Sequence, residues 1–215
     1  MSSTPGWPFS ALRPDGADWH AELQQRLFVQ RIVLVSGRLD DELTGEVVAE
    51  LMSLDALGDD PIILALSSPG GPIGCSMAIV DVIDALGVPV HATALGSVEG
   101  PPVGVLAVAA RRAASPHARL RLCEDDVAFE GPARAIEAWV AEHDERLGSF
   151  ARSLARRSSR PVDEILRDVA ARRYLSAEQA LEYGLIDEIV RPDAAVVRLA
   201  GAAGRATLGF RPSKR

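Results

Sequence analysis

The sequence predicts an α/β fold with mostly parallel strands, and three observations support this prediction. Short apolar segments typical of buried strands alternate with longer segments whose apolar residues have helical spacing. Turns rich in glycine and proline separate these segments, as at Ser67-Ser-Pro-Gly-Gly. The 215 residues, of which 47% are hydrophobic, suffice for one domain with its own core. Such an alternation is typical of helices packed on a parallel sheet.

The expected strands and helices follow one another along most of the chain. The expected strands cover residues 31–36, 61–66, 88–95, a short stretch near Leu120 and residues 185–190. The expected helices cover residues 19–28, 40–57, 73–86, a segment that ends at Ala110 after a turn over 96–102, and residues 133–157, 161–171 and 176–183. Asp40 or Asp41 is the candidate N-cap of the second helix, and Gly184 is placed to end the last one.

Composition and charge narrow the classes of function. The chain has 30 acidic and 23 basic residues and a net charge of −7. This balance argues against nucleic acid as a partner, because proteins that bind nucleic acid usually carry a basic surface. Neither Cys75 nor Cys123 lies in a metal-binding spacing. We therefore expect two reduced, partly buried thiols, and neither a metal nor a cofactor.

The sequence also predicts a cytoplasmic protein with no membrane partner. The first residues include Pro5, Pro8 and Asp15 and lack an apolar run of signal-peptide length. The longest apolar stretch, residues 101–110, is too short and too rich in glycine and proline to cross a bilayer. Residues 1–18 are expected to form a flexible N-terminal arm and residues 193–215 a loose C-terminal tail.

Three segments carry a resemblance to a known family. Arg31-Ile-Val-Leu-Val-Ser-Gly is similar to that family's opening strand, and Ile62-Ile-Leu-Ala-Leu-Ser-Ser-Pro-Gly-Gly is similar to its strand and S-P-G-G turn. Tyr174-Leu-Ser-Ala-Glu-Gln-Ala-Leu-Glu-Tyr-Gly-Leu-Ile-Asp-Glu-Ile is close to its last helix and strand. On these residues the chain resembles the ClpP family, the barrel-forming proteolytic subunit of the Clp protease.

The resemblance implies a particular version of the α/β fold. It is the spiral of strand-strand-helix units shared by ClpP and crotonase proteins, with a protruding helix-strand handle. The ClpP-like domain would then span residues 19–192, with the handle over about residues 124–158. In the handle, residues 127–132 replace the family's glycine-rich strand, and residues 133–157 supply the helix.

The residues that the family uses for catalysis are replaced in this chain. ClpP enzymes cleave peptides with a serine nucleophile, a histidine base and an aspartate that orients the histidine. By resemblance to the family's motifs, Gly100 stands at the serine position, Cys123 at the histidine position and Arg172 at the aspartate position. Glycine has no nucleophilic group, and a guanidinium cannot accept a hydrogen bond from an imidazole. The resemblance therefore implies a ClpP-like chain that has lost its serine-type peptidase activity.

The expected oxyanion hole is incomplete as well. The two backbone donors of the family match Gly71, which is retained, and Pro101, the residue after the serine position. Proline has no N–H group, and loss of one such donor typically costs about 100- to 1000-fold in turnover. Gly71 and Pro101 are thus the remnants of this part of the site.

Other side chains could in principle form a rebuilt site. Candidate nucleophiles are Ser97, Cys75 and Cys123, and Glu99 could act as a lone carboxylate. The four histidines, His20, His91, His117 and His143, all lie away from the catalytic positions. His117 precedes Cys123 by six residues, which is about 20 Å along an extended strand. We expect a structural role for His91 and exposure to solvent for His20 and His143.

The resemblance also implies partners. The family forms two stacked rings of seven subunits, so we expect a homo- or hetero-heptameric ring that can include an active ClpP paralogue. Two of the family's contacts differ here. The acid-arginine pair that links rings matches Ala170 and Ala171, and the aromatic residues of the ATPase-docking pocket match Ile63, Ala65 and Ala85. The smaller side chains remove contact area, which weakens the expectation that a Clp ATPase docks.

Three hypotheses of function follow. The first is a non-catalytic subunit of a Clp-type, self-compartmentalised protease assembly. The second is an independent oligomeric scaffold or binding protein on the same fold, favoured by the altered ring and docking contacts. The third is a crotonase-like acyl-CoA enzyme, because a block similar to residues 176–185 occurs there. The missing amide at Pro101 argues against the third, since that chemistry would use it.

Overall fold

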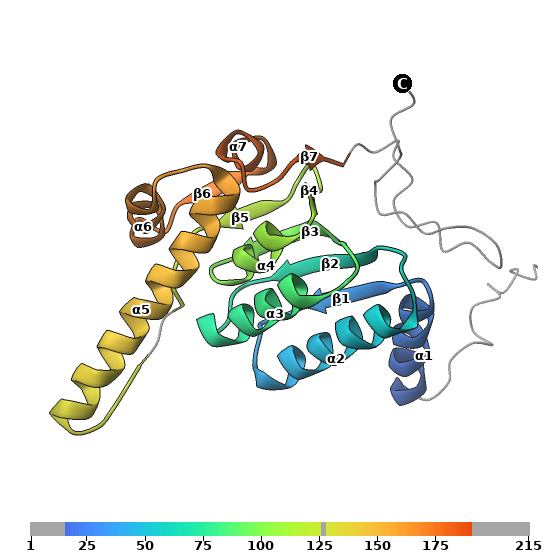
Figure 1. Ribbon diagram of the computed structural model, residues 1–215, viewed down its shortest axis with the longest axis horizontal. Helices are drawn as coiled ribbons and strands as arrows, with labels where there is room; N and C mark the ends of the chain where they lie inside the picture. Colours follow the sequence, from blue (N-terminus) through green and yellow to red (C-terminus); the bar gives the residue numbers. More distant parts are fainter. Residues whose placement is uncertain (1–15, 126–127, 191–215) are drawn as a thin grey trace, which may run out of the picture.

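A mixed sheet is the framework of the fold. The computed structural model describes residues 16–125 and 128–190. Its strands are β1 (Ile32–Ser36), β2 (Ile62–Ser68), β3 (Val90–Glu99), β4 (Arg111–Ala114), β5 (Arg119–Arg121), β6 (Tyr174–Ser176) and β7 (Glu188–Ile189). Strands β1, β2, β3, β4 and β7 lie side by side in this order and pair in parallel (Figure 1). Strand β5 pairs in parallel with β3 and antiparallel with β6. The mostly parallel sheet expected from the sequence is therefore confirmed.

Helices cover one face of this sheet and extend away from it at one end. The helices are α1 (Gly16–Val29), α2 (Asp41–Leu57), α3 (Ile73–Ala85), α4 (Pro102–Val108), α5 (Ala133–Ser158), α6 (Val162–Ala170) and α7 (Ala177–Tyr183). Helices α2, α3 and α4 form a layer on the sheet, and α1 lies beside β1 (Figure 1). Strand and helix alternate as predicted, and the α/β architecture agrees with the ClpP-type fold implied by the resemblance.

The local sequence explains why the elements begin and end where they do. The carboxylate of Asp40 caps α2 by accepting a hydrogen bond from the Leu43 N–H, at 2.9 Å. Ser176 and Gln179 form a reciprocal capping box at the start of α7. Gly184 ends α7 with φ +86°, in the left-handed region that favours glycine. Of the two candidate N-caps of α2, the structure thus selects Asp40.

Strand β3 divides the sheet into two parts. Its first half, His91–Ala94, pairs with β4, and its second half, Ser97–Glu99, pairs with β5. Gly96 lies between the two halves with φ +65°. The expected strand ended at residue 95 and was followed by a turn over 96–102, and this expectation is wrong. Pairing with β5 extends β3 to Glu99, which leaves only Gly100 and Pro101 between β3 and α4.

The long helix α5 protrudes from the body (Figure 1). Its C-terminal half is anchored in the core by Phe150, Ala151 and Leu154, all of which are buried. Its N-terminal half carries exposed apolar side chains, among them Ile136 and Val140. The helix thus forms the protruding part that the resemblance implies, and the described residues 128–132 before it contain no strand.

Other boundaries differ from the sequence-based expectation. Helix α1 begins at Gly16, three residues before its expected start. Strand β7 is reduced to Glu188–Ile189, because only this part reaches β4. The short strands β4 and β6 were not expected, since their pairing with neighbours defines them and their sequences do not alternate clearly. The rest of the expected arm and the expected tail lie outside the described residues.

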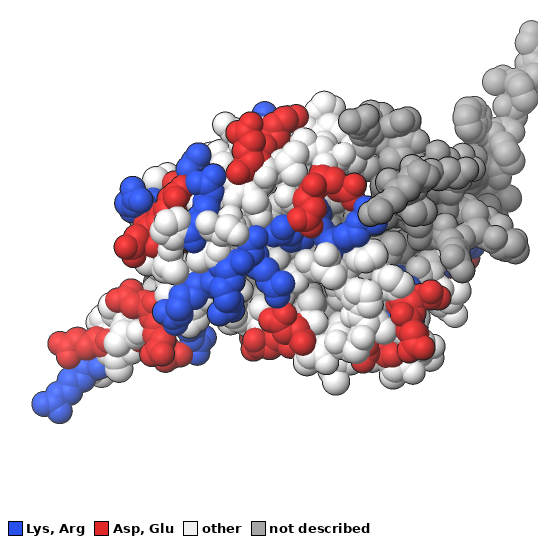
Figure 2. Space-filling view, turned by 45° about the horizontal axis from the view of Figure 1, so that its top comes forward, with Lys and Arg blue, Asp and Glu red and all other residues white. Residues whose placement is uncertain are grey.

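Charge is distributed unevenly along the chain. Residues 32–100 contain eleven acidic side chains and a single arginine. The later elements carry most arginines, and Figure 2 shows basic side chains gathered in a band with acidic groups on either side. Several of these arginines are ion-paired, including Arg112 with Asp187 and Arg157 with Asp84. Within the described ranges, no helix is both long and apolar enough to cross a bilayer.

Candidate functional site

Backbone hydrogen bonds bring the three expected catalytic positions together. The N–H of Gly100 donates to the carbonyl of Arg121, at 2.8 Å, which fixes the turn after β3 against β5. The N–H of Leu122 donates to the carbonyl of Arg173, at 2.9 Å, which fixes the residues beside Cys123 against those beside Arg172. The positions matched to the family's nucleophile, base and orienting residue therefore converge at one end of β5.

Gly100 and Cys123 face each other directly. A Cβ atom built on Gly100 would lie 3.5 Å from the Sγ atom of Cys123 and 3.2 Å from its carbonyl oxygen. Gly100 has φ +64°, which other residues rarely adopt, and Pro101 and Pro102 follow it as the cap and first residue of α4. Gly100 has no side chain and therefore offers no nucleophile at this turn. Neither of the two prolines that follow has an N–H, so neither can act as a backbone donor.

The Cys123 thiol is a weak acid in this environment. Burial raises its pKa, and the charges of Glu99 and Asp125 act in the same direction, whereas those of Arg121 and Arg172 lower it. The side chain is 7% exposed. The described groups whose charges act on this thiol include no histidine. A thiol nucleophile needs to reach its thiolate form, so Cys123 lacks the setting of a catalytic cysteine.

We expect Cys123 and Cys75 to react slowly with iodoacetamide in the folded protein. Both are free and buried, and burial is the largest cause of the raised pKa of each. At pH 8 the modification rate should be at least about tenfold below that of the urea-unfolded chain, and its rise with pH should shift to higher pH. Mass spectrometry of labelled peptides gives both rates. Equal rates for Cys123 in the folded and unfolded chain would contradict this prediction.

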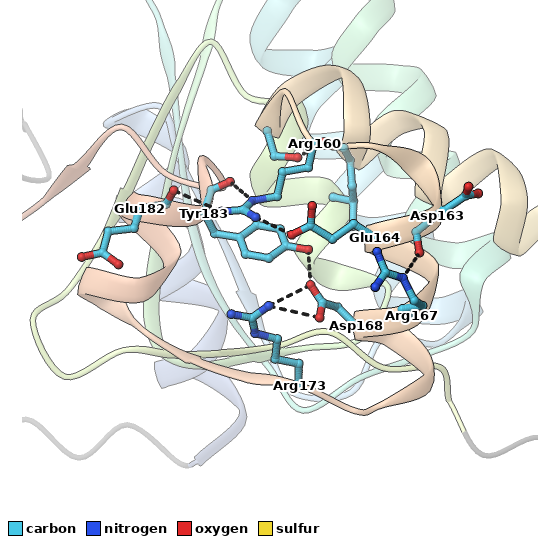
Figure 3. A network of polar contacts seen from close by, with 10 residues as sticks. Arg160, Asp163, Glu164, Arg167, Asp168, Arg173, Glu182 and Tyr183 are labelled. Atoms are coloured by element: carbon cyan, nitrogen blue, oxygen red, sulfur yellow. Dashed lines mark hydrogen bonds and ion pairs between the residues drawn. The ribbon is translucent and has the colours of Figure 1, made fainter.

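A polar network holds the segment that carries Arg172 (Figure 3). The Tyr183 hydroxyl donates to the Asp168 carboxylate, at 2.6 Å, and Arg173 forms an ion pair with the same carboxylate, at 3.0 Å. Arg160 lies over the ring of Tyr183, 4.1 Å from its centre. Burial and the Asp168 hydrogen bond raise the pKa of Tyr183 strongly, so this hydroxyl remains a donor at neutral pH. Arg172 lies in the chain between Asp168 and Arg173, which form an ion pair, and its backbone has φ +53°.

The glycine turn after β2 is held tightly by Leu39, which lies two residues before the start of α2. The Leu39 N–H donates to the Gly70 carbonyl, at 2.9 Å, and the Ser68 hydroxyl donates to the same oxygen, at 3.0 Å. A Cβ atom on Gly71 would lie 2.6 Å from both the Cβ and the carbonyl oxygen of Leu39. Arg38 and Asp125 form an ion pair next to Gly70. The turn therefore has a packing role that is independent of any bound substrate.

The side chains considered for a rebuilt site do not form one. The Ser97 hydroxyl donates to Glu99, at 2.9 Å, and Arg121 pairs with the same carboxylate, at 3.3 Å. Cys75 instead lies at the start of α3, with its Sγ atom 3.5 Å from Asp41. Within the described ranges, no group of three or more histidine, cysteine, aspartate or glutamate side chains could hold a metal ion. Ser97 and Glu99 are thus paired with each other, without a histidine between them.

The described histidines add no catalytic base. His91 lies on β3, where burial and the charge of Arg111 lower its pKa. His143 was expected to face solvent, and this expectation is wrong. Its ring stacks on Trp139 at 5.1 Å between centres, and its Nε2 atom lies 3.0 Å from the Glu124 carboxylate. The side chain of His20 lies outside the described residues.

The histidine on the protruding helix belongs to an aromatic stack that the sequence analysis missed. Phe129 also stacks on Trp139, at 5.4 Å between ring centres. The spacing of four residues between Trp139 and His143 places both on one helix face and was the available signal. The stack borders a groove between the start of α3 and the protruding helix, which is also lined by Ile73 and Arg146.

The positions matched to the family's assembly contacts lie in different parts of the molecule, and only some of them are exposed. Ile63 and Ala65 are buried in a small cluster with Ile32, on the sheet face opposite the α2–α4 layer. Ala85 is exposed at the end of α3, and Ala170 and Ala171 are exposed at the end of α6. These side chains offer neither the aromatic groups nor the charges of the family's contacts.

Comparison with known proteins identifies the family of this chain and agrees with its fold. A family model described as Clp protease matches residues 15–193. One relative, the ATP-dependent Clp protease proteolytic subunit-related protein 2, chloroplastic, of Arabidopsis thaliana, is 29% identical over 192 residues. The alignment covers 88% of this chain and 68% of the relative. The chain belongs to the Clp protease family.

Proposed function

We propose that this chain is a non-catalytic subunit of a Clp-type protease assembly in the cytoplasm. One observation carries the proposal: at the turn where the family has its nucleophile, the chain has Gly100 followed by two prolines. The turn faces Cys123, whose raised pKa and surroundings do not suit a base or a nucleophile. In this reading Gly100, Cys123 and Arg172 occupy the triad positions, and Gly71 and Pro101 those of the oxyanion hole.

The family match supports the part of the proposal that concerns assembly. Members of this family act as subunits of rings, and the fold keeps the protruding helix α5 with exposed apolar residues on its outer half. The name of the Arabidopsis relative describes that protein as related to the proteolytic subunit and places it in the chloroplast. A subunit without its own chemistry would shape the chamber or limit the activity of a catalytic paralogue in the same ring.

The alternative is an independent oligomeric scaffold or binding protein. Its support is the replacement of family contacts by Ala170, Ala171 and Ala65. Both readings exclude peptide hydrolysis by this chain and differ in whether an active ClpP joins the oligomer. The family match favours both over an acyl-CoA enzyme.

Peptidase activity and native mass together test the proposal. We expect no cleavage of fluorogenic peptides by the purified chain, since nucleophile and base are replaced. Mixed with active ClpP from the same cell, the chain should enter a common particle, and a single ring of seven 22.9 kDa chains has a mass of about 160 kDa. Cleavage that is lost in Cys123→Ala or Ser97→Ala would refute the non-catalytic assignment. An oligomer that excludes ClpP would favour the independent scaffold.

A further inference from the structure

An apolar groove with an acidic rim lies between α1, β1 and α2. Its apolar walls include Leu27 from α1, Leu34 from β1 and Val47 from α2. Leu34 is 43% exposed, which is unusual for a leucine on a strand whose neighbours are buried. The groove lies at the outer edge of the sheet, because β1 pairs only with β2 among the described strands.

Two carboxylates on α2 form the acidic rim of this groove. Glu46 and Glu50 are four residues apart and therefore share one face of the helix. Burial and the charge of Glu46 raise the pKa of Glu50. Among the described residues neither carboxylate has a cationic partner. A cation bound at this rim would relieve the repulsion between the two groups.

The C-terminal segment of the chain has the complementary chemistry. Residues 191–215 contain six basic side chains and one acidic side chain. Within them, residues 205–211 read Arg-Ala-Thr-Leu-Gly-Phe-Arg, so that Leu208 and Phe210 are flanked by Arg205 and Arg211. An apolar pair between two guanidinium groups fits an apolar groove with two carboxylates at its rim.

The segment is also long enough to reach the groove. Strand β7 ends at Ile189 and lies four strand positions from β1, which is about 19 Å at the usual strand spacing. The chain between Ile189 and Leu208 can extend to about 60 Å. The segment of the same subunit can therefore reach the groove, and so can that of an adjacent copy.

We propose that residues 205–211 bind in the groove between α1, β1 and α2, with Leu208 and Phe210 against its apolar walls and the two arginines at Glu46 and Glu50. The bound segment covers the exposed Leu34 and neutralises part of the acidic half of the chain. This interaction is independent of the non-catalytic assignment, because it uses no residue of the triad positions. It gives the C-terminal segment a function as a ligand of its own fold.

Photo-crosslinking in the full-length protein tests the contact. With p-benzoylphenylalanine in place of Phe210, we expect adducts within residues 23–50, mapped by mass spectrometry. The same probe in place of Ala200 serves as the matched control and should give at least about fivefold less adduct there. Isotope-labelled and unlabelled copies in one sample distinguish the segment's own subunit from an adjacent one. Adducts elsewhere, or equal adducts from both probe positions, would overturn the proposal.

A charge exchange tests the acidic rim separately. In the probe-bearing chain, Glu46→Arg should lower the adduct yield at least about fivefold, and Arg211→Glu in the same chain should restore it. Glu42→Arg is the matched control, because Glu42 is exposed on α2 outside the groove. Circular dichroism checks that each variant is folded. Equal losses from Glu42→Arg and Glu46→Arg would show a general charge effect and overturn the assigned pairing.

Discussion

Replacement of Gly71 by alanine should destabilise the fold by about 3 kcal/mol or more. The new Cβ atom would lie 2.6 Å from the Cβ atom and the carbonyl oxygen of Leu39. Leu39 is fully buried, and its N–H is bonded to Gly70, so it cannot move aside without breaking the turn. The backbone at Gly71, with φ +156°, also disfavours a side chain. Urea unfolding followed by circular dichroism measures the change.

Gly45→Ala is the matched control for this substitution. Gly45 lies inside α2, and no atom lies within 4 Å of its would-be Cβ. Alanine there should stabilise the protein by up to about 1 kcal/mol, because glycine is a poor helix former. A cost below about 1 kcal/mol for Gly71→Ala would mean that Leu39 and the turn separate easily. The turn would then lack the packing role that its geometry indicates.

This packing role gives the turn a reason to have glycine at position 71 that is independent of catalysis. In the proposed reading, Gly71 matches an oxyanion donor, yet the contact with Leu39 requires a glycine at that position in any case. Gly100 differs, because a Cβ there would meet Cys123 at 3.2–3.5 Å, which a small shift can accommodate. The retained glycine is thus set by packing, whereas packing alone does not forbid a serine at position 100.

The helices and the central strands could be predicted because local patterns define them. Helix α2 has an N-cap, a periodic apolar face and a terminal glycine, and β2 is a continuous apolar run before a turn. The extension of β3 to Glu99 could not be predicted, because it depends on pairing with β5, which is twenty residues further along the chain. The short strands β4 and β6 escaped prediction for the same reason.

In the candidate site too, contacts between segments that are far apart in the sequence could not be predicted. Family resemblance located Gly100, Cys123 and Arg172, and the structure places them near one another through backbone bonds. The pairing of Ser97 with Glu99 required the extension of β3, which places both side chains on one face of the strand. The contacts of Phe129 with Trp139 and of Glu124 with His143 required the fold of the segment before α5, because Phe129 and Glu124 come from that segment. Contacts between distant segments are therefore what the sequence leaves open.

Phe150→Ala should destabilise the protein by about 4 kcal/mol. Phe150 is 1% exposed and anchors α5 against α4, the helix that begins after the Gly100 turn. Its ring packs where Gly104 has no side chain, since a Cβ on Gly104 would lie 2.9 Å from the ring atom Cε2. Thermal and urea unfolding measure the cost, and a value below about 2 kcal/mol would contradict the anchor role.

A double-mutant cycle separates this contact from general loss of packing. Gly104→Ala alone should cost about 1–2 kcal/mol, because overlap with the Phe150 ring outweighs the gain in helix propensity. In the Phe150→Leu background the overlap disappears, so Gly104→Ala should become neutral or stabilising. We therefore expect a coupling energy of about 1–2 kcal/mol between the two sites. Additive effects within about 0.5 kcal/mol would show that α4 and α5 are not held by this contact. Since α4 starts just after Gly100, the same coupling would link the protruding helix to the turn that is matched to the family's nucleophile position.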